Sequence, residues 1–178
     1  MLLAWLLACP RPTPPDALIG EDGAAGEAAR AAPTGAVVNG VWADRRYPWT
    51  LRVPAGWEVR PGDESDGPRA SFAHAESGAV LQVWALPDGE PGPHTRAGCA
   101  WQFVDTAGYR ALPSPPTRVA TCTPADAREP RRLGYFVHAD GVAYDLELVL
   151  PAGALLAGKR AGDVLVGGFR THAPGDTR

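Results

Sequence analysis

Residues 133–150 read LGYFVHADGVAYDLELVL, in which large apolar side chains alternate with other residues on both sides of Asp140-Gly141. Asp-Gly is the preferred pair for a two-residue type I′ hairpin loop, because both loop residues need a positive φ. A loop at these residues places Val137 opposite Tyr144 and gathers the large apolar side chains on one face. A shift of one residue would destroy this agreement. The segment therefore predicts an antiparallel hairpin with one packed face.

Other extended segments are expected upstream of this hairpin. A second hairpin around Ser77-Gly78 would place Phe72 opposite Val83 on one face. Short runs of alternating or β-branched residues, bounded by Pro and Gly, predict further strands. These runs lie at residues 41–43, 49–53, 57–59 and 117–123.

Two segments have the i, i+3, i+4, i+7 spacing of an amphipathic helix. In residues 95–107 that spacing is formed by Ala100, Phe103, Val104 and Ala107. In residues 152–170 a longer stripe is formed by Ala157, Ala161, Val164, Leu165, Gly168 and Phe169. Long antiparallel strands with covering helices predict an α+β fold, an antiparallel β-sheet with helices packed on it.

A family resemblance is visible in residues 49–57, which read WTLRVPAGW. This stretch resembles the aromatic–x–hydrophobic–x–hydrophobic–Pro–x–Gly–Trp opening of PsbP-like and DcrB-like domains. The closing part is similar too, with Leu150-Pro151 followed by a helix that contains residues 164–169. The resemblance covers about residues 41–172 and implies a small α/β/α sandwich in an exported accessory or binding domain. It carries over no catalytic residues, and the Pro/Gly-rich residues 87–93 depart from the family pattern.

The N-terminal residues predict where in the cell the protein is located. Residues 1–9 read MLLAWLLAC, and their last four resemble the bacterial lipobox, in which the cysteine receives a diacylglycerol after the signal is cut. We therefore expect lipidation at Cys9 and a real start codon upstream, since no basic residue precedes the apolar run. The alternative is an apolar N-terminal helix docked on the domain.

The remaining organisation follows from composition. Residues 10–40 are rich in Pro, Ala and Gly and predict a flexible tether, residues 41–172 a single domain, and residues 173–178 a tail. We expect a bacterial envelope protein that is held to the membrane by its lipid and has an envelope protein as partner. Pro10, where inner-membrane lipoproteins of some bacteria carry Asp, favours the outer membrane.

Two further cysteines, Cys99 and Cys122, form an even pair once Cys9 is lipidated. An exported protein would tend to oxidise such a pair. The resulting disulfide would contribute about 3 kcal/mol to stability. The alternative is two small buried thiols.

Several chemistries lack support in the sequence. A net charge of −3 gives no electrostatic footprint for nucleic acid, and no apolar run is long enough to span a membrane as a helix. The four histidines show no metal-ligand spacing, so we expect no metal and no cofactor. A Gly-x-Ser-x-Gly nucleophile elbow is absent, and we expect no enzyme activity. Asp145 and Glu147 share one strand face, where we expect them to face solvent or to pair with arginines rather than act as an acid–base pair.

Tryptophan is the one residue type in evident surplus. Trp49 and Trp57 are expected to anchor the core, whereas Trp84 and Trp101 lie away from the predicted apolar stripes. If exposed, Trp84 and Trp101 could stack on a glycan or a partner; the alternative is that a helix or second layer covers Trp84. Three hypotheses remain: a non-catalytic accessory or protein-interaction domain, a ligand- or glycan-binding module that uses these two rings, and an unrecognised hydrolase.

Overall fold

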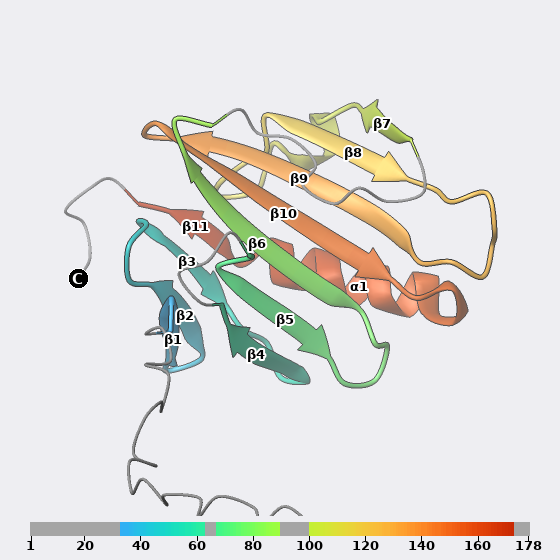
Figure 1. Cartoon of the computed structure of the whole chain (residues 1–178), viewed down its shortest axis with the longest axis horizontal. Helices are drawn as coiled ribbons and strands as arrows, with labels where there is room; N and C mark the ends of the chain where they lie inside the picture. Colours follow the sequence, from blue (N-terminus) through green and yellow to red (C-terminus); the bar gives the residue numbers. More distant parts are fainter. Residues whose placement is uncertain (1–32, 63–66, 90–99, 173–178) are drawn as a thin grey trace, which may run out of the picture. The chain divides into compact units, whose positions relative to one another are not determined.

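The computed structural model describes residues 33–62, 67–89 and 100–172, and Figure 1 shows their arrangement. The chain divides into two units, Met1–Arg30 and Ala31–Arg178, and every described residue belongs to the second. In the described part, antiparallel strands form two sheets and one α-helix packs beside them. The fold class is therefore α+β, as predicted. The helical layer that an α/β/α sandwich would place on the second face is absent from these residues.

The smaller sheet has four strands in the order β1-β2-β3-β11. Asn39 and Gly40 have φ of 52° and 72° and form a two-residue loop that pairs Val38 with Val41. This is the Asn-Gly hairpin geometry, in which both loop residues need a positive φ. The bounds of the four strands are Gly35–Val38, Val41–Asp44, Trp49–Arg52 and Phe169–Thr171.

Strand β1 corrects the predicted domain boundary. It lies inside residues 10–40, which composition assigned to a flexible tether. Thr34 is buried, and its hydroxyl donates to the carbonyl oxygen of Arg69. The folded unit therefore begins before residue 41, and a tether can extend no further than the residues that precede Thr34.

The larger sheet has seven strands in the order β4-β5-β6-β10-β9-β8-β7. Its central hairpin, β9–β10, has the predicted register, with Val137 opposite Tyr144 across the Asp140-Gly141 loop. The β5–β6 hairpin is also present, but Phe72 lies opposite Leu81 rather than Val83. A shift of two residues keeps every side chain on its predicted face. In sheet order the strands are Trp57–Pro61, Ala70–His74, Val80–Pro87, Val142–Leu150, Arg131–Ala139, Arg118–Cys122 and Trp101–Val104.

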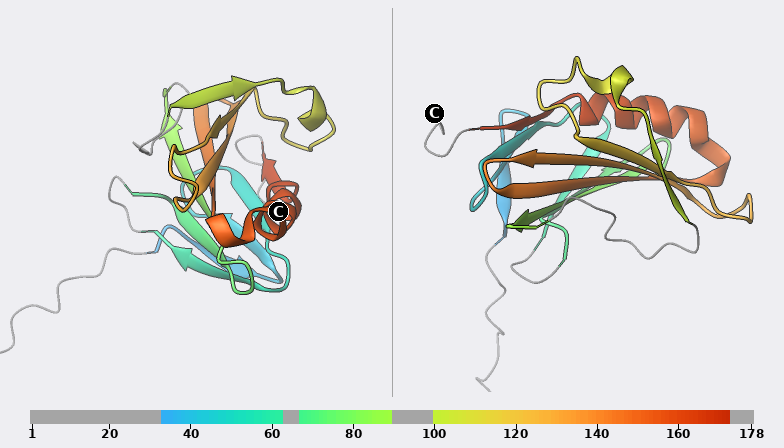
Figure 2. Two further views of the ribbon diagram at one scale, coloured as in Figure 1. Left: turned by 90° about the vertical axis from the view of Figure 1, so that its right-hand side faces the viewer. Right: turned by 90° about the horizontal axis from the view of Figure 1, so that it is seen from above.

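The C-terminal helix is shorter than predicted and presents a different stripe to the core. Helix α1 spans Leu155–Val166, follows the 3₁₀ turn Ala152–Ala154, and lies along one face of the seven-stranded sheet (Figure 2). Its buried residues are Gly158, Gly162, Leu165 and Val166, whereas Val164 is 63% exposed.

Glycine sets this contact because α1 lies very close to β10. A Cβ atom at Gly162 would fall 2.2 Å from Cδ2 of Leu148, and one at Gly158 would fall 3.1 Å from Cδ2 of Leu150. The predicted stripe is correct at Leu165, which is buried, and wrong at Val164. It omits Gly158 and Gly162 because hydrophobicity selects alanine, whereas the close approach requires residues without a side chain.

The predicted helix at residues 95–107 is also wrong in its described part. Trp101–Val104 form β7, which pairs with β8, and a 3₁₀ turn follows at Ala107–Tyr109. Aromatic and β-branched residues favour strands when a partner strand is available. A helical spacing read over a few residues was therefore overridden by the ladder with β8.

The core lies between the two sheets and α1. Trp49 and Trp57 belong to it, as predicted, and Trp49 packs on Phe169 with ring centroids 5.6 Å apart. Strands β4, β5, β6, β8, β9 and β10 of the larger sheet contribute alternate side chains to it, as the pleat of a strand requires. Its largest fully buried contributors on this side are Phe72, Leu81, Tyr135, Tyr144, Leu146 and Leu148.

A buried ion pair ties the small sheet to the large one. Arg69, just before β5, donates from Nε and Nη2 to the two carboxylate oxygens of Asp44 at 3.0 and 3.1 Å. The side chains are 7% and 0% exposed, and the guanidinium lies over the Tyr47 ring at 5.1 Å. A bidentate pair of this kind fixes the position of both partners.

Candidate functional site

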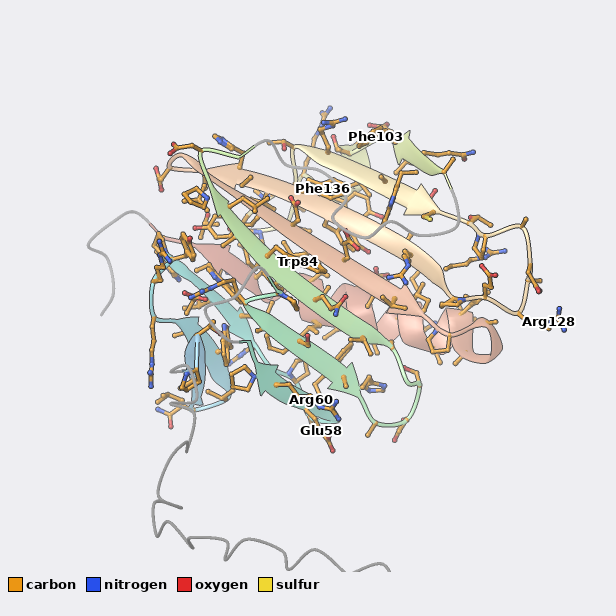
Figure 3. All side chains as sticks on the ribbon, viewed as in Figure 1. Glu58, Arg60, Trp84, Phe103, Arg128 and Phe136 are labelled. Carbon is orange, nitrogen blue, oxygen red and sulfur yellow. The ribbon has the colours of Figure 1, made fainter. Side chains whose placement is uncertain are left out.

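Figure 3 looks onto the face of the seven-stranded sheet that is turned away from α1, which we call the outer face. Glu58 and Arg60 project from β4 at one edge, Trp84 from β6, and Phe103 and Phe136 from β7 and β9 toward the other edge. Both edges of this face are exposed, but its centre is not. The outer face therefore contains a buried polar centre and an exposed aromatic edge.

The buried centre consists of two carboxylates on β10. Asp145 and Glu147 are each 0% exposed, so the prediction that they face solvent is wrong. Asp145 lies between Trp84 on β6 and Phe136 on β9, and Glu147 lies between Gln82 and Gly134. Alternation correctly placed them on the face opposite the core, but it cannot show whether that face is covered.

Phe136 provides part of that cover. A Cβ atom at Gly134 would fall 2.4 Å from Cζ of Phe136, so the ring lies flat over the glycine beside Glu147. Both carboxylates have interaction partners. Burying a carboxylate is tolerated when it is paired or hydrogen-bonded, which indicates a structural network at this point.

The exposed end of the outer face is an aromatic cluster. Phe136 contacts Trp101 and Phe103, with ring centroids 6.5 and 6.4 Å apart. The guanidinium of Arg118 lies 4.0 Å from the centroid of Phe103, within the range of a cation–π interaction. Phe103 remains 51% exposed. We call Trp101, Phe103, Arg118 and Phe136 the aromatic edge.

The aromatic edge sits on a strand that ends the sheet. In the described part, β7 pairs with β8 on one side and with no strand on the other. Such an edge presents backbone N–H and C=O groups that another extended chain can pair with. Val104, the last residue of β7, is 41% exposed and adds apolar surface at the same edge.

The two tryptophans predicted as ligand-binding residues do not form one platform. Trp84 and Trp101 are both half-buried and both on the outer face, but β10, β9 and β8 lie between their strands. Four strand steps separate them by about 19 Å. The structure therefore brings Trp101 together with Phe103, Phe136 and Arg118, which the sequence analysis did not select.

The described histidines lie apart and serve local contacts. His74 Nδ1 lies 3.0 Å from Ser77 Oγ, His172 Nε2 lies 2.8 Å from Thr50 Oγ1, and His138 is exposed. His94 lies outside the described residues. Among residues whose positions are described, no group of three or more His, Cys, Asp and Glu side chains could hold a metal ion.

A second polar cluster surrounds Tyr135 on the helix side of the sheet. Its hydroxyl donates to Asp163 Oδ1 at 3.3 Å, and Lys159 Nζ lies 2.6 Å from the other oxygen. Burial, aided by the charge of Asp163, raises the pKa of Tyr135 well above its usual range. A tyrosine that exchanges protons near neutral pH needs the opposite shift, so this cluster has a structural character.

Of the predicted cysteine sites, the structure describes only one residue. Cys122 is buried in β8, whereas Cys9 and Cys99 lie outside the described residues. Lipidation at Cys9 and the Cys99–Cys122 disulfide therefore stay predictions. No helix in the described ranges has the length and apolarity needed to cross a membrane.

No protein-family model matches this chain, and no curated protein matches it. Six chains of solved structure are similar to this one, among them the following two. A crystal structure from Bacteroides thetaiotaomicron has a TM-score of 0.46 and 8% identity, over 74% of this chain and 47% of that one. The solution structure of cyanobacterial PsbP (CyanoP) from Synechocystis has a TM-score of 0.45 and 12% identity, over 86% of this chain and 100% of that one.

The chain spans about half the length of the Bacteroides protein that it matches. A PsbP protein is among the similar structures, and PsbP is one of the two families that residues 49–57 resemble. Identities of this size concern the fold alone. The DcrB-like part of the resemblance stays a prediction.

Proposed function

We propose that this chain is a lipid-anchored bacterial envelope protein whose folded unit is a non-catalytic protein-interaction domain. The contact surface in this proposal is the aromatic edge. The observation that carries it is the half-exposed ring of Phe103 beneath the guanidinium of Arg118, on a strand that ends the sheet. Aromatic residues and arginine are enriched at protein interfaces and supply most of their binding energy.

The edge strand adds a second means of contact. A partner segment that extends the sheet along β7 would gain backbone hydrogen bonds, and the side chains of Phe103 and Arg118 would add selectivity. Phe103 is held from below by Phe136, which is itself 0% exposed. A ring that is supported in this way loses little conformational freedom on binding, which favours affinity.

The acidic residues support a non-catalytic role. Asp145 and Glu147 are fully buried and already have interaction partners. A general acid or base must reach its substrate within hydrogen-bonding distance. Buried carboxylates that already have interaction partners are better suited to stabilising the sheet than to transferring a proton to or from a substrate.

Attachment to the membrane through Cys9 is the second part of the proposal. It is supported by the lipobox-like residues 6–9 and by the Pro/Ala/Gly-rich composition that follows them. Pro10 favours the outer membrane as the place of attachment. The test is detergent phase partitioning of the full-length gene product. We expect wild type in the detergent phase and Cys9→Ala in the aqueous phase; equal partitioning would contradict the anchor.

The Cys99–Cys122 disulfide belongs to the same proposal. Trp101 is the Cα partner of Cys122 in the β7–β8 ladder, and Cys99 precedes Trp101 by two residues. The closeness of Cys99 in sequence to the residue opposite Cys122 supports this pairing. Thiol alkylation before and after reduction should reveal two additional free thiols only after reduction. Cys99→Ser should lower the free energy of unfolding by about 3 kcal/mol.

The interaction itself is tested by crosslinking and pull-down of the acylated protein from its native envelope. We compare wild type, Phe103→Ser and the control Val38→Ser, which changes a 64% exposed residue on β1. A partner recovered with wild type and Val38→Ser but lost with Phe103→Ser supports the proposal. Equal recovery with all three would place the contact elsewhere.

One observation favours a glycan-binding module as the second candidate. Trp84 is half-buried, and Gln82, two residues before it on the same face of β6, is half-buried too. Sugar sites combine an aromatic ring with nearby carboxylate or amide groups. Titration with peptidoglycan and polysaccharide fragments should change tryptophan fluorescence in wild type and not in Trp84→Phe. An unresponsive wild type would remove this candidate.

A further inference from the structure

A pocket of about 390 Å³ lies where the first turn of α1 meets the ends of β8, β9 and β10. Four leucines supply its apolar lining: Leu133, Leu150, Leu155 and Leu156. Its volume is within the range of pockets that hold small molecules. It lies apart from the aromatic edge, none of whose residues lines it.

The rim of this pocket is cationic. Arg131, Arg132 and Lys159 line it, and no carboxylate does. Lys159 is paired with Asp163 at 2.6 Å, so its charge is already balanced. Arg131 is exposed and Arg132 half-buried, and neither makes an ion pair with a carboxylate of the described residues. Arg131 shares its face of β9 with Leu133, whereas alternation turns the Arg132 side chain toward the outer face. Arg131 therefore brings to the rim a positive charge that no carboxylate of the described residues pairs with.

The start of α1 adds to this field. The helix begins at Leu155 without a side-chain cap, and its first turn carries no acidic residue. Leu155 and Leu156, both in that turn, line the pocket. The positive end of the helix dipole thus lies at the same pocket as Arg131, with no acidic side chain in that turn to offset it.

We propose that this pocket binds one small amphiphilic anion, an aliphatic chain that ends in a carboxylate or phosphate group. The leucines cover the chain, and Arg131 holds the anionic end. A purely hydrophilic anion would leave the leucines unused, and a neutral hydrocarbon would leave the guanidinium group unmatched. Only a ligand with both parts satisfies the whole pocket.

The test is isothermal titration of the full chain with dodecanoate, kept below its micelle concentration. We expect one saturable site, with affinity that falls about fourfold for each methylene group removed from the covered part of the chain. Arg131→Gln removes the charge-assisted hydrogen bonds and should weaken binding by about tenfold. Unchanged affinity in an Arg131→Gln variant that keeps the wild-type melting temperature would overturn the proposal.

Two positions on α1 provide a matched pair for the apolar part. Leu156 and Val164 are 66% and 63% exposed, but only Leu156 lines this pocket. Leu156→Ser should weaken dodecanoate binding, whereas Val164→Ser should leave it unchanged. Equal effects of the two substitutions would show that the chain is bound elsewhere on the protein and would count against the pocket.

Three further ligands distinguish the chemistry and its source. Acetate tests the anion alone, decanol tests the chain alone, and vesicles with anionic lipids test a membrane surface. We expect each of the first two to bind far more weakly than dodecanoate. Equal binding of either one would contradict an amphiphile site. Binding to vesicles with no binding of monomeric dodecanoate would show a membrane-contact surface instead of a pocket for a single molecule.

Discussion

The two faces of the seven-stranded sheet differ in what buries them. The face toward α1 and the small sheet is apolar and covered by elements that pack on it, such as the Gly158–Gly162 side of the helix. The outer face is buried only at its centre, where Asp145 and Glu147 have interaction partners, and it ends in exposed aromatic rings. Alternation along a strand thus shows to which face of the sheet a side chain points, but not whether that face is covered or exposed to solvent.

The largest expected effect is at the buried polar centre. Glu147→Ala should lower the free energy of unfolding by about 3–5 kcal/mol, because it removes a fully buried carboxylate from the groups that interact with it. Glu58→Ala, at an exposed carboxylate on the same face, should cause no measurable change. Urea denaturation of both variants measures this difference. A Glu147→Ala protein as stable as wild type would mean that the centre of the outer face is open to water.

Substitutions on the apolar face should lower the free energy of unfolding by disturbing its packing. Leu148→Ala should cost about 2–5 kcal/mol, because it opens a cavity beside α1. Gly162→Ala should cost about 1–3 kcal/mol, because its Cβ would meet the Leu148 side chain at 2.2 Å.

The two substitutions should also compensate each other. In the Leu148→Ala background the added methyl group at position 162 has room, so its cost should disappear. A double-mutant cycle from denaturation curves gives the coupling directly. Strict additivity would show that helix and strand are not in contact at this point.

The raised pKa of Tyr144, on the apolar face, predicts how the stability of the protein changes at alkaline pH. Burial, with smaller contributions from nearby carboxylates, raises the pKa of Tyr144 to about 12. The unfolded chain ionises first, near pH 10. The contribution of Tyr144 to the free energy of unfolding is therefore fully present below pH 10 and is lost as the pH rises toward 12.

At pH 11 this loss amounts to about 1 kcal/mol. Denaturation of wild type and Tyr144→Phe at pH 8 and 11 measures it. The Phe variant should lose less stability between the two pH values. Parallel losses in both proteins would show that Tyr144 ionises as freely in the folded state as in the unfolded one.

The smallest effect on stability is expected at the aromatic edge. Phe103→Ser should change the free energy of unfolding by no more than about 0.5 kcal/mol, because the ring is half-exposed. Phe136→Ala, at the buried ring that Phe103 contacts, should cost about 3–5 kcal/mol. Thermal unfolding of both variants separates a surface ring from a structural one. Similar large losses would assign Phe103 to the core.

Both the presence of the central hairpin and the pairing of its residues could be predicted from the sequence. Its loop pair, Asp140-Gly141, and the alternation beside it are both local signals. The Asn39-Gly40 loop is an equally local signal, and it was overlooked because the surrounding composition resembles a tether. Phe136, a large aromatic residue on the face predicted to be polar, was the sequence clue that this face is partly covered.

The rest depends on contacts between distant segments. Residues 101–104 fit helical spacing, and only the neighbouring β8 makes them a strand. The stripe of α1 follows from how closely Leu148 approaches, which hydrophobicity does not encode. The aromatic edge combines β7, β8 and β9, so its members become neighbours only in the folded chain.

Photo-crosslinking in the native envelope tests the proposed contact surface most directly. A photoreactive phenylalanine analogue replaces either Phe103 or, as the control, Val38, which is 64% exposed on β1. We predict a discrete crosslinked product from position 103 that position 38 does not give. No product at position 103, or the same product from both positions, would contradict the assignment of the aromatic edge as the binding surface.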